Sequence, residues 1–129
     1  MALASWTPGG FMGELLAIHV AHVPPPLDLP DPVRWGDADL VREWFSDGPW
    51  ELTTEVRTLS IRYRHSPGGT AELFRAAYGP TVHAFGPLEE DRRAALAADL
   101  IAHWTRHRRA TGAGTEVEAE FLELLAVRR

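Results

Sequence analysis

The chain has 129 residues, of which 45% are hydrophobic and 24% charged, a balance typical of a single globular domain over residues 1–129. The absence of cysteine excludes disulfides, a thiolate nucleophile and cysteine-ligated metal, and no run of about 18 apolar residues is present that would span a membrane. The net charge of −5 argues against general nucleic-acid binding, which needs a positive field. The first ten residues lack the basic and apolar regions of a secretory signal, so we expect a cytoplasmic protein.

The first third of the chain predicts a strand followed by two helices. Residues 2–6 form a short apolar run before a proline-glycine turn, which is typical of a buried strand. Residues 11–23 carry apolar side chains at helical spacing, and the proline-rich residues 24–32 end that helix in an irregular connection. Asp37 is predicted as the N-cap of a short helix that reaches Phe45.

The middle of the chain predicts one long strand and two further helices. In residues 50–64 the apolar positions change phase near Arg57 and Thr58, which indicates a bulge or a strand that leaves the sheet. Residues 71–78 predict a short helix. Residues 87–110 predict the longest helix, because acidic residues fill its first turn and arginines its last.

The last segment, residues 115–129, fits two structures. Its apolar residues fit a helix with glutamates on the opposite face, and most of them also fit the alternation of a strand. Local propensity favours the helix, but periodicity alone does not decide.

Two histidine pairs have spacings found in metal sites. His103 and His107 are four residues apart on the longest predicted helix, and His19 and His22 are three apart. Arg106 is a poor neighbour for a cation, and no glutamate stands between His103 and His107. We therefore predict no metal, a solvated helix face for His103 and His107, and a polar lip for His19 and His22. A small metalloprotein is the weakest of three hypotheses.

Five tryptophans are the most unusual feature of the composition. Trp44 and Trp104 fall on apolar stripes and are predicted to pack in the core. Trp6 and Trp35 lie beside turns, where burial is harder, so we expect them to contact a ligand. No Ser-His-Asp arrangement or phosphate-binding glycine loop is recognisable, so no catalytic residue is assigned.

Several short segments also carry a family likeness. Residues 3–11 read LASWTPGGF and are followed by GELL at residues 13–16. Further along stand Val23–Pro26, Pro32–Gly36, Glu72–Phe74 and, before the long helix, Tyr78–Pro80. In this order the segments resemble class I S-adenosylmethionine-dependent methyltransferases of the ubiquinone/menaquinone-biosynthesis-like type.

The resemblance implies the C-terminal half of such an enzyme, with a partial Rossmann-like α/β sheet packed with about four helices. Residues 2–6 would be strand five, residues 50–63 strand six and residues 115–127 strand seven. Strand seven of the family is antiparallel and lies between strands five and six, so the resemblance favours a strand for the last segment. The family's glycine-rich turn and acidic residue have no counterpart here, so no cofactor-binding residue is assigned.

The resemblance implies methyl transfer from S-adenosylmethionine to a small-molecule substrate as the parent activity. We expect Trp6, Phe11, Met12 and Trp35, which follow strand five or lie in its connection, to contact the acceptor. The chain by itself is expected to be inactive and to bind no cofactor. The alternative is a non-catalytic small-ligand-binding or dimerisation module, because strand five would expose an unpaired edge. We expect either a homodimer or a missing N-terminal half to cover that edge.

Overall fold

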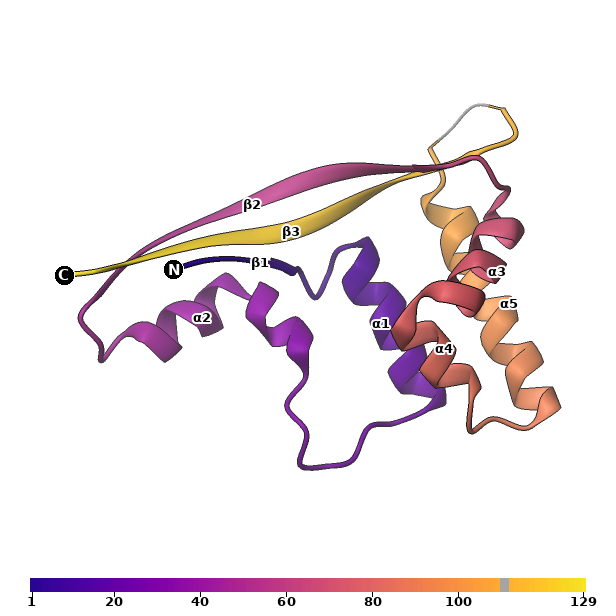
Figure 1. Cartoon of the computed structure of the whole chain (residues 1–129), viewed down its shortest axis with the longest axis horizontal. Coiled ribbons are helices and arrows are strands. Elements are labelled where there is room, and N and C mark those ends of the chain that lie inside the picture. Colours follow the sequence, from indigo (N-terminus) through magenta and orange to yellow (C-terminus); the bar gives the residue numbers. More distant parts are fainter. Residues whose placement is uncertain (110–111) are drawn as a thin grey trace. The chain divides into compact units, whose positions relative to one another are not determined.

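The computed structural model describes residues 1–109 and 112–129 as an α/β fold (Figure 1). Within this part of the chain, no helix is both long and apolar enough to cross a membrane. In chain order the elements are β1 (Ala2–Trp6), α1 (Phe11–His22), the 3₁₀ helix η1 (Pro32–Gly36), α2 (Ala38–Phe45), β2 (Trp50–Tyr63), α3 (Pro67–Ala77), α4 (Gly79–Phe85), α5 (Glu90–His107) and β3 (Thr115–Arg128).

The chain divides into two compact units. The sheet unit comprises Met1–Glu14, Leu29–Leu59 and Ala119–Arg129. The helical unit comprises Leu15–Asp28 and Ser60–Glu118.

The three strands form one antiparallel sheet in the order β1-β3-β2. In the pairing of β1 with β3, Ala2 lies opposite Leu125 and Trp6 opposite Phe121. Figure 1 shows β1 and β2 running in the same direction, with β3 running the opposite way between them. The predicted strand order is confirmed, and so is the strand predicted for the last segment. Local helix propensity is overridden there because β3 is the central strand and gains a neighbour on each side.

Both long strands change the phase of their burial. In β2 the half-buried positions shift from Trp50, Leu52 and Thr54 to Ile61 and Tyr63, which confirms the predicted phase change. In β3 the buried positions shift from odd-numbered residues up to Ala119 to even-numbered residues from Leu122. A one-residue shift moves side chains to the other face of a sheet, so each strand uses both faces along its length.

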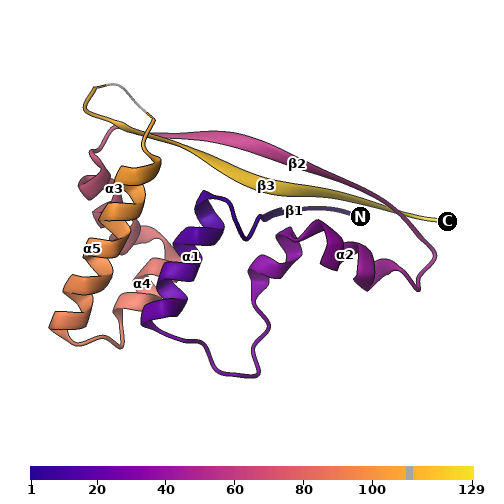
Figure 2. The same cartoon turned by 180° about the vertical axis from the view of Figure 1, so that it is seen from behind.

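Helix α2 covers one face of the sheet unit, and both views place it on the same side of the strands (Figures 1 and 2). The helix begins because the Asp37 carboxylate accepts hydrogen bonds from the first-turn backbone N–H groups, as its N-cap prediction requires. Val41 is fully buried against the core face of β3, where its partners are Leu122, Leu124 and Ala126. Burial of Val41, Leu122 or Leu124 stabilises the unit by about 1.5–3 kcal/mol for each side chain.

The helical unit is centred on Trp104 of α5, which is 1% exposed. Its ring lies edge-on to Phe74 of α3 and to Tyr63, with centroids 4.9 and 5.7 Å apart. Leu96 and Leu100 continue the same buried stripe, so the core position predicted for Trp104 is confirmed, whereas Ile101 on the margin of this stripe is exposed. Helix α3 also packs against α4, and Figure 2 shows these helices grouped from behind.

Some helix boundaries differ from the prediction. Helix α3 begins at Pro67, four residues before the predicted start, because the Ser66 hydroxyl accepts a hydrogen bond from a first-turn N–H group. Helix α4 was not predicted, and it begins where Gly79 and Pro80 follow α3, because proline is suited to a first helical turn. Helix α5 ends at His107, and the predicted end at Ala110 lies outside the described residues.

Candidate functional site

The sheet unit has a hollow at the C-terminal end of β1. Its volume is about 400 Å³, and it is lined by Ala4, Ser5, Trp6, Leu59 and Phe121. Trp6 and Phe121 are opposite residues in the β1–β3 pairing, and their rings meet edge to face with centroids 6.4 Å apart. The volume and the aromatic lining are those of a site for a small apolar or aromatic molecule. We call it the Trp6 pocket.

Of the four residues predicted to contact an acceptor, Trp6 lines this pocket. Phe11 and Met12, at the start of α1, are 2% and 4% exposed and belong to the buried core. Trp35, in η1, is half-exposed and packs instead against Trp44, with ring centroids 4.9 Å apart. The structure therefore brings one of the four to the pocket.

Trp44 was predicted to be buried, and this is wrong because 42% of its surface is exposed. Val41 and Phe45, four residues apart, share the face of α2 that meets the sheet. Trp44 lies at the margin of that face, where it packs against Trp35 and under the Arg34 guanidinium.

Leu59 and Phe121 were not predicted as site residues. Phe121 reaches Trp6 only through the pairing of the first strand with the last, 115 positions later in the chain by their numbers. A strand assignment for residues 115–129 is the sequence signal that would have pointed to it. No local sequence pattern predicts the register of the β1–β3 pairing, which sets Phe121 opposite Trp6.

The Trp6 pocket is expected to bind an aromatic probe such as anilinonaphthalene sulfonate. Trp6→Ala should weaken binding about tenfold, because it removes one aromatic wall, and Leu59→Glu should do the same because it places a charge in the apolar lining. Trp35→Ala is the matched control, since Trp35 does not line the pocket. Fluorescence titration measures the affinities and circular dichroism checks the folds. Equal binding by Trp6→Ala and Trp35→Ala would contradict the assignment.

Histidines are concentrated in the helical unit. His103 and His107 lie one turn apart on α5, with ring centroids 4.7 Å apart. His103 is 1% exposed and His19 of α1 is 6% exposed, so the predicted solvated face and polar lip are wrong for these two residues. The reason is helix packing: His22 of α1 pairs with Asp99 of α5 at 2.7 Å.

His19 is held as a neutral side chain. Its Nε2 atom lies 3.1 Å from the Thr81 hydroxyl, and its Nδ1 atom has no hydrogen-bond partner among the residues that the structure describes. Burial, helped by the neighbouring His103 and His22, lowers the pKa of His19 from 6.5 to about 4. The imidazole therefore carries no charge at neutral pH.

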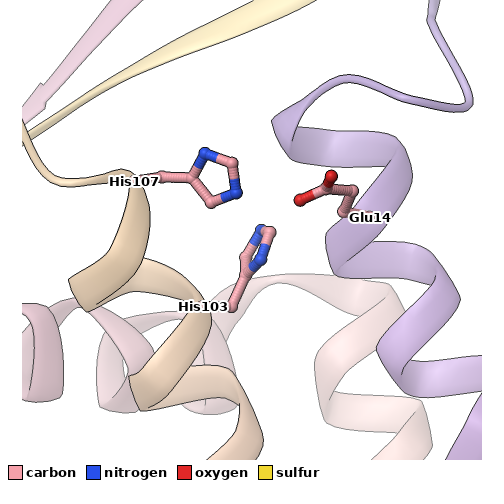
Figure 3. Close-up of side chains that lie close together, drawn as sticks. All are labelled: Glu14, His103 and His107. Carbon is pink, nitrogen blue, oxygen red and sulfur yellow. The ribbon is translucent and has the colours of Figure 1, made fainter.

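Figure 3 draws His103 and His107, whose rings project from the same side of α5. Two imidazoles four residues apart on one helix are close enough to share a metal ion.

Comparison with known proteins identifies longer relatives. No family model matches the sequence. The chain is 31% identical over 101 residues to uncharacterized proteins of two Mycobacterium tuberculosis strains, H37Rv and CDC 1551, and of Mycobacterium bovis. The match covers 78% of this chain and 36% of each relative, so the chain spans little more than a third of the length of these relatives.

Proposed function

We propose that the chain is the acceptor-binding portion of an S-adenosylmethionine-dependent methyltransferase that acts on a small apolar or aromatic molecule. The observation that carries this proposal is the sheet, in which antiparallel β3 lies between β1 and β2. The resemblance described above implies the same order for strands five, seven and six. Because β1 and β2 both run antiparallel to β3, they run parallel to each other, as strands of a doubly wound sheet do.

The position of the Trp6 pocket supports an acceptor site. Open α/β sheets bind their ligands beyond the carboxyl ends of the parallel strands. Ser5 and Trp6 are the last two residues of β1, and both line the pocket. An aromatic wall at this place suits a flat substrate, which the enzyme would hold toward the methyl group.

The length of the relatives supports a cofactor half elsewhere. The matched segment is 36% of each relative, which leaves enough chain for a further domain. Within the described sheet, β1 has a strand neighbour on one side only. Its other edge is where the proposal places the strands that carry the glycine-rich turn and the acidic residue of the cofactor site.

Calorimetric titration with S-adenosylhomocysteine tests the proposal. We expect the full-length M. tuberculosis relative to bind this product analogue, and we expect this chain alone to give no heat because the glycine-rich turn is absent. Adenosine monophosphate serves as the control, since it lacks the amino-acid part that a methyltransferase recognises. If the relative gives no heat, the proposal is wrong, and the chain is then better described as a small-ligand-binding or dimerisation module.

A further inference from the structure

We propose that a hollow between α3 and α5 in the helical unit binds the phosphate group of a small organic molecule. The hollow has a volume of about 450 Å³ and is lined by Arg75 of α3 and by Glu90, Arg93, Ala94 and Ala97 of α5. All of these residues belong to the helical unit, in which α3 packs against α5 (Figure 2). We call it the arginine hollow. It lies in a different unit from the Trp6 pocket and does not depend on the methyltransferase proposal.

One buried residue, Phe85 at the end of α4, holds both guanidinium groups of the arginine hollow. Arg93 donates hydrogen bonds from Nε to the Phe85 carbonyl oxygen, at 3.1 Å, and from Nη2 to the Gly86 carbonyl oxygen, at 3.2 Å. The Arg75 guanidinium lies over the Phe85 ring, with its Cζ atom 4.7 Å from the ring centroid. Because both arginines contact the same residue and line the same hollow, the fold sets their positions relative to one another.

These contacts position the arginines and leave them able to bind an anion. Both acceptors of Arg93 are neutral carbonyl oxygens, which do not cancel its charge, and the two bonds use two of the five N–H donors of a guanidinium. Arg75 lies 3.7 Å from Glu72, and the two side chains are 43% and 61% exposed. Ion pairs between such exposed side chains are weak. The other N–H groups of both arginines can therefore donate to an oxyanion.

The charge and shape of phosphate suit two guanidinium groups. A phosphate monoester carries a charge of about −1.5 to −2 at pH 7 and has three acceptor oxygens, so it can accept hydrogen bonds from two arginines at once. A carboxylate has one charge and two oxygens. The first turn of α5 lines the hollow through Glu90 and Arg93, and the positive end of the helix dipole favours the anion there. The Glu90 carboxylate opposes it, so removing that charge should strengthen binding.

The size of the arginine hollow indicates an organic phosphate, because about 450 Å³ lies within the range of small-molecule sites and exceeds what a single phosphate group occupies. Ala94 and Ala97 are three residues apart and share one face of α5. Their small apolar side chains line the hollow beside the arginines, where they offer a surface to the organic part of the ligand.

Titration of the chain with phenyl phosphate, followed by amide NMR spectra, tests the site. We expect one molecule bound per chain, with the largest shifts at Ala94 and Ala97. Arg75→Gln should weaken binding about tenfold, because it removes a charge-assisted contact, and Glu90→Gln should strengthen it about threefold. Arg62→Gln is the matched control, since it removes the same charge from β2, outside the hollow, and should change the affinity less than about twofold.

Inorganic phosphate and benzoate separate the two parts of the ligand, and phenyl phosphate should bind more tightly than either. Benzoate bound as tightly as phenyl phosphate would overturn the assignment to phosphate, and inorganic phosphate bound as tightly would overturn the organic part. Equal affinities of Arg75→Gln and Arg62→Gln, or shifts that spare Ala94 and Ala97 in the natural chain, would overturn the site itself. Because the shifts are mapped on the natural chain, this last test does not depend on the stability of any variant.

Discussion

Gly36→Ala is expected to lower the free energy of unfolding by about 3 kcal/mol. Gly36 ends η1, where the backbone passes directly over the last residue of β1. A Cβ atom at this position would lie 2.6 Å from the carbonyl carbon of Trp6 and 2.9 Å from the Cα atom of Thr7, and it would also meet the Trp6 carbonyl oxygen. All of these are backbone atoms, so no side-chain rotation relieves the contact, and η1 or the end of β1 has to move.

Urea unfolding of the variant beside Gly9→Ala measures this effect. Gly9 lies in the turn after β1, and a Cβ atom there would have no neighbour within 4 Å, so its replacement is expected to change stability by less than about 0.5 kcal/mol. Gly36→Ala should also weaken probe binding in the Trp6 pocket, because the displaced backbone is that of Trp6. If the two variants unfold at the same urea concentration, the close approach of η1 to β1 is incorrect.

Acidification from about pH 6.5 to about pH 4 is expected to remove about 2 kcal/mol of stability through His19. The unfolded chain takes up a proton at this histidine near pH 6.5, whereas the folded chain resists it until about pH 4. Between these values the unfolded state binds more protons, so falling pH favours unfolding. The contribution is fully present above pH 6.5 and is lost as the pH falls through this window.

Urea unfolding at a series of pH values, with His19→Gln and His83→Gln in parallel, isolates this contribution. The glutamine at position 19 keeps a hydrogen-bonding partner for the buried Thr81 hydroxyl but does not titrate, so its stability should depend less on pH. His83 is exposed on α4, and its replacement should leave the pH dependence of the natural chain unchanged. Parallel curves for all three proteins would show that His19 does not titrate as its burial requires.

Local chemistry in the sequence predicted the elements that depend on near neighbours. The run at residues 2–6 became β1, Asp37 caps α2, and the stripe that includes Trp104 is the buried face of α5. Each of these follows from a short-range rule, either the period of a strand or helix or the pairing of a side chain with the first backbone N–H groups. The phase change in β2 was visible for the same reason.

The tertiary structure decided what depends on distant partners. Residues 115–129 favour a helix by propensity, and become a strand because two other strands pair with them. The same pairing brings Phe121 to Trp6. Helix packing buries His103, which was predicted on a solvated face, and His19, which was predicted to form a polar lip. Side-chain periodicity shows which face of a helix or strand is apolar. Strand register and helix packing across the whole chain decide which residues of other elements lie against that face.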